Sequence, residues 1–434
     1  MCLDHFRVAC KTHHDDHYHS DAFSGKSCRS EAPFISSVDN NPSIGKSMLA
    51  STFPSQGSEN LKILQLLPAL GDGGVERSTV EMAQYLSARG IPNLVASRGG
   101  ALVSAVEAVG SRHVSIPVGS KSPFTIIRAA RSVARLIDAE GISVVHARSR
   151  APAWVGLLAC KLAKRQARFI TTFHGVYSHG NVLKRLYNSA MLRTPVVIAN
   201  SQFIRRHIVD VYGYPEERIV VAPRGIDPAL FEPATISDAT RSAVRAELGV
   251  MKGVPLAVMV SRITNWKGHS VFVDAMARCS RNDLHAAFVG EGNPDEIARV
   301  KQQIERLGLS DRIFFAGSRR DVPAILAAAD LAVSASIRPE AFGRAAIEAQ
   351  AMKTPVIATN HGGSRETVLP GETGWLVPPG DVAALAAALE EAFADPGRLA
   401  VMGTHGREHV LATFTTQQML EREFSAYEKR TAAP

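Results

Sequence analysis

The sequence predicts an α/β protein with two doubly wound parallel sheets, and three observations lead to that prediction. The chain has 434 residues, which suits two domains of ordinary size better than one. From residue 61 onward, short apolar runs alternate with helical stretches, the pattern of a parallel sheet covered by helices. The alternation loosens over residues 228–252 and then starts again, which indicates a second sheet.

The first expected domain spans residues 61–227. Its seven strands are expected at 62–68, 93–97, 113–117, 143–147, 169–173, 196–199 and 219–222. The helices between them include 76–89, 123–139, 151–164 and 202–212. Helix signals support this reading, because Ser122 and Pro123 suit a helix start, and Gly90 and Gly141 lie just past expected helix ends.

The second expected domain spans residues 228–410. Its six strands are expected at 255–261, 285–289, 312–316, 331–334, 356–358 and 375–377. We expect residues 411–434 to form a C-terminal helix that packs back on the first domain. Residues 1–60 lack sustained periodicity and are rich in Ser, His, Asn and Asp, which predicts a disordered tail.

Composition narrows the class of protein. Apolar residues make up 45% of the chain and charged residues 21%, the balance of a globular protein with substantial cores. No run approaches 18 uninterrupted apolar residues, and the first twenty residues lack the apolar region of a secretory signal. Five widely spaced cysteines indicate reduced thiols. These features predict a cytoplasmic protein.

The positive charge is concentrated in the first half of the chain. Residues 61–230 carry 22 basic and 10 acidic side chains, whereas residues 231–434 carry 22 and 24. Two explanations stay open: ordinary solubility, and peripheral contact with an anionic membrane, on the inner face of the cytoplasmic membrane. The most membrane-like group places Lys184, Arg185 and Arg193 around apolar residues. No nucleic-acid motif is found, so we expect no nucleic-acid partner.

A glycine-rich turn with the sequence GDGGVE, residues 71–76, follows the first expected strand and opens a helix. It lacks the third glycine of a dinucleotide fingerprint, and the next strand ends at Ser97 and Arg98 without an acid to hold a ribose. A dehydrogenase is therefore disfavoured. The free amides at the helix start suit an anion or hydroxyl groups, and the alternative is a plain tight turn.

The second half carries charged residues at strand ends. Arg262 closes a strand and Lys267 precedes a helix, a combination that suits a diphosphate. After strand 331–334 come Glu340 and, eight positions on, Glu348. Carboxylates accept hydrogen bonds from paired hydroxyls, and the free amides at the helix start near Gly343 would receive a phosphate.

Taken in order, these motifs resemble the family 4 glycosyltransferases, which are retaining enzymes of the GT-B fold with two Rossmann-like domains facing a central cleft. The resemblance covers residue 61 to the C-terminus. It is carried by Glu-x7-Glu at 340–348, Gly-Gly-x-x-Glu at 362–366, Gly-x-x-Gly-Trp-Leu-Val at 371–377 and Ser-Arg…Trp-Lys-Gly at 261–268. The chain departs from the family at the domain junction, where the usual Pro-Asn-Gly is Pro223-Arg224-Gly225.

The resemblance implies roles for the charged residues. Arg262 and Lys267 would hold the donor diphosphate, Glu348 would bind the ribose hydroxyls, and His174 would face the sugar across the cleft. As the family implies, the acceptor attacks from the front face and the leaving diphosphate takes its proton. Arg262 and Lys267 would stabilise the charge that grows on the diphosphate.

The resemblance also assigns the residues around the sugar. Glu340, with the backbone amides of Phe342 and Gly343, would bind the transferred sugar. Gly73 and Gly74 would line the junction between donor and acceptor. No Asp-x-Asp element is found, so we expect neither a metal nor a cofactor.

The implied activity is transfer of a hexose, mannose or glucose in type, from a UDP-, GDP- or ADP-linked donor. The acceptor would be a glycan or lipid-linked glycan in lipopolysaccharide or other cell-surface polysaccharide synthesis. Two alternatives stay open: a sugar-nucleotide epimerase of the same architecture, and an inactive homologue that serves as a scaffold. The presence of Glu340, Glu348, Arg262 and Lys267 argues against the second, because an inactive site would be free to lose them.

Overall fold

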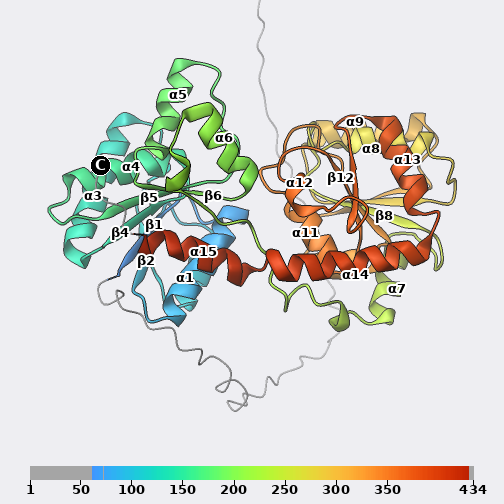
Figure 1. Ribbon diagram of the computed structural model, residues 1–434, viewed down its shortest axis with the longest axis horizontal. Helices are drawn as coiled ribbons and strands as arrows, with labels where there is room; N and C mark the ends of the chain where they lie inside the picture. Colours follow the sequence, from blue (N-terminus) through green and yellow to red (C-terminus); the bar gives the residue numbers. More distant parts are fainter. Residues whose placement is uncertain (1–60, 72, 430–434) are drawn as a thin grey trace, which may run out of the picture. The chain divides into compact units, whose positions relative to one another are not determined.

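The computed structural model describes residues 61–71 and 73–429, so the expected disordered tail lies outside the described residues. Two separate sheets are present, and every strand pair within them is parallel. Helices pack on both faces of each sheet (Figure 1). The predicted fold class, two Rossmann-like α/β sheets, is confirmed.

The first sheet has seven strands in the order β3-β2-β1-β4-β5-β6-β7. The order reverses between β1 and β4, which makes this the switch point of the sheet. The strands are β1 Ile63–Leu66, β2 Asn93–Ser97, β3 Arg112–Ser115, β4 Val144–Ala147, β5 Arg168–Phe173, β6 Val196–Ala199 and β7 Ile219–Val221. Most are buried along their whole length, as expected of parallel strands covered on both faces.

Two apolar clusters cover the two faces of the first sheet. Leu64 and Leu66 point to the face packed by α3, α4 and α6, whereas Ile63 points to the face packed by α1 and α15. The shorter helices α2 and α5 lie in the same half of the chain. The bounds are α1 Gly74–Ala88, α2 Val103–Ala108, α3 Pro123–Glu140, α4 Arg150–Leu162, α5 Val182–Asn188, α6 Gln202–Tyr212 and α15 Thr416–Glu428.

The second sheet has six strands in the order β10-β9-β8-β11-β12-β13, with its reversal between β8 and β11. The strands are β8 Leu256–Val260, β9 His285–Val289, β10 Ile313–Gly317, β11 Leu331–Ser334, β12 Val356–Thr359 and β13 Gly374–Val377. The helices are α7 Asp238–Glu247, α8 His269–Arg278, α9 Pro294–Arg306, α10 Val322–Ala328, α11 Arg344–Ala351, α12 Ser364–Thr367, α13 Val382–Ala392 and α14 Pro396–Thr413.

The chain crosses between the sheets twice, and the two crossings pair with each other. Residues 223–226 follow β7, and residues 414 and 415 join α14 to α15. The Ile226 N–H donates to the Phe414 carbonyl at 2.9 Å, and the Thr416 N–H donates to the Ile226 carbonyl at 2.7 Å. A Cβ on Gly225 would lie 2.3 Å from the Thr415 carbonyl oxygen, so this close approach requires glycine.

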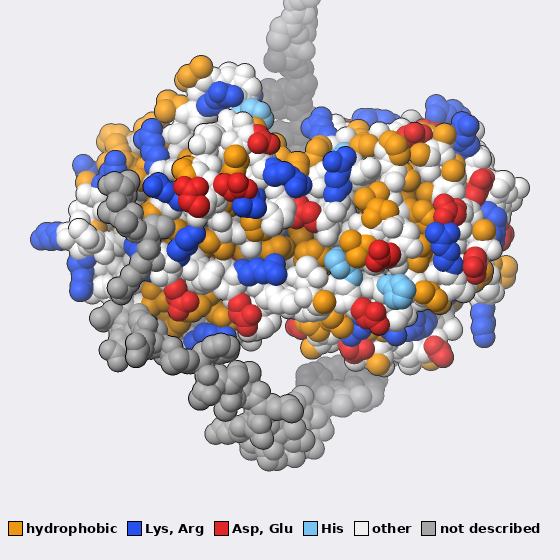
Figure 2. Space-filling view, in the orientation of Figure 1, with side chains coloured by type: hydrophobic (Ala, Val, Ile, Leu, Met, Phe, Trp, Pro, Cys, Tyr) orange, Lys and Arg blue, Asp and Glu red, His pale blue; other side chains and the backbone are white. Residues whose placement is uncertain are grey.

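Helix α5 exposes apolar side chains beside basic ones. Val182 is 80% exposed, Leu183 76% and Leu186 53%, and Lys184 and Arg185 lie between them in the sequence. Figure 2 shows hydrophobic and basic side chains next to each other in this region. Among the described residues, no helix has the length and apolar character needed to cross a membrane.

Candidate functional site

A cavity of about 640 Å³ lies at the carboxyl ends of strands from both sheets. Its first-sheet wall comes from the start of α1 and from the residues after β5, β6 and β7. Its second-sheet wall comes from the residues after β8 and β11 and from the start of α11. Open α/β sheets bind ligands at this edge, close to the point where the strand order reverses.

The cavity brings together every residue that the sequence predicts for catalysis or donor binding except Gly73. The lining includes Gly74, His174, Arg262, Lys267, Glu340, Phe342, Gly343 and Glu348. Gly73 instead occupies the N-cap position of α1, next to the cavity wall in sequence but not part of it.

Glu340 is held by two donors and by the turn that follows β12. Its Oε1 accepts from Lys267 Nζ at 2.5 Å and from Ser336 Oγ at 2.6 Å. Its backbone carbonyl accepts from the Gly363 N–H at 2.9 Å. A Cβ on Gly362 would lie 2.4 Å from that carbonyl oxygen, so the two glycines allow the turn to support the Glu340 loop.

Glu348 lies on α11, one turn past the start of the helix at Arg344. The helix begins after Gly343, whose φ of +94° favours glycine, and Phe342 packs edge-on against Phe414 with ring centroids 5.3 Å apart. Glu348 Oε1 lies 3.0 Å from a guanidinium nitrogen of Arg344. Burial raises the pKa of Glu348, and Arg344 acts in the opposite direction.

Glu366 links the second sheet to helix α6 of the first. Its carboxylate accepts from the backbone N–H of Gln202 at 2.8 Å and of Phe203 at 2.6 Å. Ser201 Oγ donates to the Ala341 carbonyl at 2.6 Å, next to the Glu340 loop. The free amides and the dipole at the start of α6 stabilise the Glu366 carboxylate. Because these hydrogen bonds join residues of the two sheets, they hold the two cavity walls together.

His174 and Arg224 meet on the first-sheet wall. An Arg224 guanidinium nitrogen lies 2.7 Å from His174 Nδ1, and the Asn200 side-chain amide donates to the His174 carbonyl at 3.3 Å. Burial, and next the charge of Arg224, hold the pKa of His174 well below its usual range. Burial also lowers the pKa of Arg224 to about 10, so Arg224 remains charged at neutral pH.

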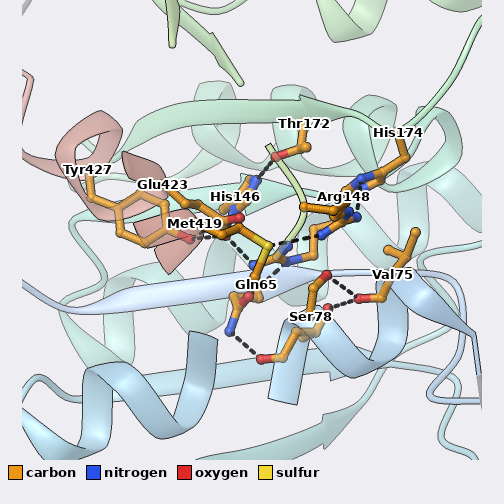
Figure 3. Close-up of polar contacts among 12 residues, drawn as sticks. Gln65, Val75, Ser78, His146, Arg148, Thr172, His174, Met419, Glu423 and Tyr427 are labelled. Atoms are coloured by element: carbon orange, nitrogen blue, oxygen red, sulfur yellow. Dashed lines mark hydrogen bonds and ion pairs between the residues drawn. The ribbon is translucent and has the colours of Figure 1, made fainter. Parts of the chain in front are cut away.

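Behind that wall lies a buried polar network that the sequence analysis does not predict (Figure 3). Arg148, fully buried at the end of β4, forms an ion pair with Glu423 of α15 and donates from Nε to Gln65 Oε1 at 2.8 Å. His146 bonds through Nδ1 to the Tyr427 hydroxyl at 2.8 Å. The sequence signal for it is a pair of polar residues, His146 within an otherwise apolar strand and Arg148 directly after it.

Two further features bear on ligand binding. In the described part of the chain, the Arg262 side chain forms no hydrogen bond or ion pair, so its guanidinium is available on the cavity wall. A second cavity of about 320 Å³ begins at the adjacent Ile263 and lies at the carboxyl ends of β9 and β10. It is also lined by Gly290, Glu291, Gly292, Ile297, Lys301, Phe315 and Gly317.

Two family models match the chain, one in each half. Residues 72–230 match the model described as "Glycosyltransferase Family 4", and residues 240–409 match the model described as "Glycosyl transferases group 1". The GDP-mannose-dependent monoacylated alpha-(1-6)-phosphatidylinositol monomannoside mannosyltransferase of Corynebacterium glutamicum is 37% identical over 212 residues, 46% of this chain and 53% of the relative. The chain spans about half the length of the first curated relatives that it matches.

Two solved structures resemble the fold over most of the chain. A glycosyltransferase from Rickettsia africae is 38% identical with a TM-score of 0.79, covering 85% of this chain and 98% of that one. Anabaena Alr3699/HepE, solved in complex with UDP-glucose, is 26% identical with a TM-score of 0.73, covering 85% and 99%. The chain therefore belongs to the family 4 glycosyltransferases, with the GT-B fold.

Proposed function

We propose that the protein is a retaining hexosyltransferase that takes a mannose- or glucose-type sugar from a nucleoside-diphosphate donor. The observation that carries the proposal is the convergence of Arg262, Lys267, Glu340 and Glu348 on one cavity at the carboxyl ends of both sheets. Two cations suit a diphosphate, and two carboxylates suit the hydroxyls of a ribose and a hexose.

Lys267 Nζ and Glu340 Oε1 lie 2.5 Å apart, and a bound donor would replace this contact with contacts of its own. A donor diphosphate would draw Lys267 toward its oxygens and free Glu340 Oε1 to accept from a sugar hydroxyl. Arg262 would contribute the second cation. As charge develops on the leaving diphosphate, both cations would stabilise it more strongly than they stabilise the ground state, which lowers the barrier.

Glu348 would accept from the ribose hydroxyls, and the backbone amides at the start of α11 would face the phosphates. We assign the nucleotide base of the donor to the cavity that begins at Ile263, because Ile263 follows Arg262 directly in the sequence. Gly74 lies on the opposite wall, where a donor and an acceptor would meet.

For the acceptor, we propose a glycan or lipid-linked glycan used in lipopolysaccharide or other cell-surface polysaccharide synthesis. The exposed Val182, Leu183 and Leu186 of α5, with Lys184 and Arg185, support peripheral attachment to an anionic membrane on its cytoplasmic side. Each basic residue near such a surface contributes about 1 kcal/mol. The relative from Corynebacterium glutamicum is named for a lipid acceptor, a phosphatidylinositol monomannoside.

Donor binding is tested first, by thermal denaturation with UDP-glucose, GDP-mannose and ADP-glucose. A donor present at 100 times its dissociation constant stabilises the folded state by about 2.7 kcal/mol. The donor that stabilises most is then incubated with and without acceptor glycans, and the anomeric configuration of the product is determined. Conversion of the donor sugar to its epimer without acceptor would favour the epimerase instead, and no stabilisation by any donor would refute the proposal.

A further inference from the structure

His174 has one bonded and one unbonded ring nitrogen. Its Nδ1 faces the guanidinium of Arg224 at 2.7 Å. Because a guanidinium has only donors, Nδ1 must be the acceptor, and the proton of the neutral ring is then on Nε2. That Nε2 is buried without a hydrogen-bond partner among the described residues, and His174 is part of the cavity wall.

Asn200 offers the complementary group on the same wall. Its Nδ2 donates to the His174 carbonyl at 3.3 Å, which fixes the orientation of the amide. Its Oδ1 is then left as an acceptor, and it too is buried without a partner in the described chain. Buried polar groups are costly unless they are bonded. Hydroxyl groups suit both atoms, because a hydroxyl can accept a hydrogen bond from Nε2 or donate one to Oδ1.

We propose that Arg224 is a positioning residue that holds His174 as the Nε2–H tautomer, so that His174 Nε2 presents a hydrogen-bond donor to a hydroxyl of the bound donor sugar, beside the acceptor that Asn200 Oδ1 offers on the same wall. The inference rests on the proposed function, because it requires a sugar in this cavity. It also gives a role to position 224, where the family motif usually has asparagine.

The surroundings of Arg224 keep it in place. Arg224 is 8% exposed and lies in the first crossing segment, next to Gly225, whose contact with Thr415 leaves no room for a side chain. A second guanidinium nitrogen lies 3.8 Å from Met419 Sδ of α15. Burial lowers the pKa of Arg224, Arg148 and Arg344 act in the same direction, and the carboxylates of Glu423 and Glu81 oppose them.

The charges around His174 also oppose a second proton on the ring. Burial lowers the pKa of His174 most, and Arg224, Arg148 and His146 act in the same direction. A neutral ring with its proton on Nε2 is therefore the state that the surroundings support, and loss of Arg224 would remove both the fixed tautomer and part of the electrostatic effect.

Three variants test the proposal. Arg224→Met removes the donors while keeping an extended side chain, and Arg224→Lys keeps a charged donor. Arg407→Met is the matched control, because Arg407 is a half-buried arginine that donates to the Phe231 and Ala351 carbonyls away from the cavity. The first readout is the ¹⁵N spectrum of histidine-labelled protein, in which the His174 signals are assigned by their loss in His174→Gln.

In the wild type and in Arg224→Lys, we expect His174 to show a protonated Nε2 and an unprotonated Nδ1 at neutral pH. In Arg224→Met, the signals should indicate a mixture of tautomers, whereas Arg407→Met should resemble the wild type. If wild-type His174 carries its proton on Nδ1, or is charged at neutral pH, the proposal is wrong, and this result needs no folded Arg224 variant.

The second readout is the pH dependence of donor hydrolysis, with water as acceptor and UDP-glucose or GDP-mannose as substrate. Arg224→Met should lower the rate of donor hydrolysis about tenfold, which corresponds to the free energy of one hydrogen bond. Since the pKa of His174 should rise when Arg224 is removed, the fall in rate at acid pH should begin at a higher pH. Arg224→Lys should restore both.

The two readouts separate this proposal from the proposed function. A wild-type protein that binds and hydrolyses no nucleotide sugar would refute the transferase, while the tautomer of His174 would still be determined. An active protein whose Arg224→Met variant keeps the wild-type tautomer and pH profile would overturn the positioning role alone.

Discussion

Replacing Glu423 by glutamine removes one charge from an enclosed ion pair while keeping the size of the side chain. The side chains of Arg148 and Glu423 are 0% and 2% exposed. Glu423 also accepts from the Tyr427 hydroxyl at 3.2 Å, a bond that glutamine can keep. The main effect of Glu423→Gln is thus to leave the Arg148 guanidinium buried without a counter-charge.

The expected loss is about 3–5 kcal/mol, the cost of breaking a buried ion pair by removing one partner. For a cooperative unit of 150–250 residues, 1 kcal/mol corresponds to about 2–4 °C in melting temperature, so the expected decrease is about 6–20 °C. Removing both charges in Arg148→Met/Glu423→Leu should cost less than Glu423→Gln, because no uncompensated charge remains inside the protein.

Differential scanning calorimetry at neutral pH is the measurement, with Glu421→Gln as the control. Glu421 lies on the same helix but is exposed, and it accepts from Gln417 at 2.6 Å. Its replacement should change stability by no more than about 0.5 kcal/mol. A Glu423→Gln protein that melts within 1 °C of the wild type, or a double variant less stable than the single one, would refute the reasoning.

The remaining predictions concern the site and the surface. Glu348→Ala should weaken donor binding by roughly 1.5–3 kcal/mol, because ribose hydroxyls would lose a charged acceptor; unchanged affinity in calorimetric titration would contradict the assignment. Arg262→Ala and Lys267→Ala should each lower kcat by about 10²–10³, and wild-type turnover in both would place the diphosphate elsewhere. Leu183→Ser/Lys184→Glu should reduce sedimentation with anionic vesicles, and about 0.5 M salt should abolish it in the wild type, since the Debye length then falls to about 4 Å. Equal sedimentation with neutral vesicles would exclude electrostatic attachment.

The parts of the fold that the sequence predicts are those with local signals. Each expected strand is present, because an apolar run bounded by turn residues is a short-range pattern. The cavity residues are predictable for a related reason: Arg262, Lys267 and Glu340 lie in the loops that join the ends of strands to the next helices, and parallel strands bring their carboxyl ends to one edge. Strand bounds are less well predicted, since the sequence predicts a strand over 62–68 and β1 spans Ile63–Leu66.

The contacts that the sequence does not predict join residues far apart in the chain. Arg224 and His174 are 50 positions apart, and Glu366 and Gln202 are 164 apart. Neither pair leaves a periodic pattern, since each depends on how two crossings and two loops pack in space. The sequence shows a departure from a motif, such as the arginine at position 224, but only the structure shows that its partner is His174.

The return of α15 to the first sheet has a consequence for the order of folding during synthesis. Arg148 and Glu423 are separated by 275 positions. At a synthesis rate of about 5–20 residues per second, a ribosome would add Arg148 to the chain roughly 14–55 s before it adds Glu423. Throughout that interval, the first half lacks both the counter-ion for its buried guanidinium and the apolar cover that Met419, Leu420 and Tyr427 supply. The second half, including α14, can therefore complete its core before the first half does, although it is synthesised later.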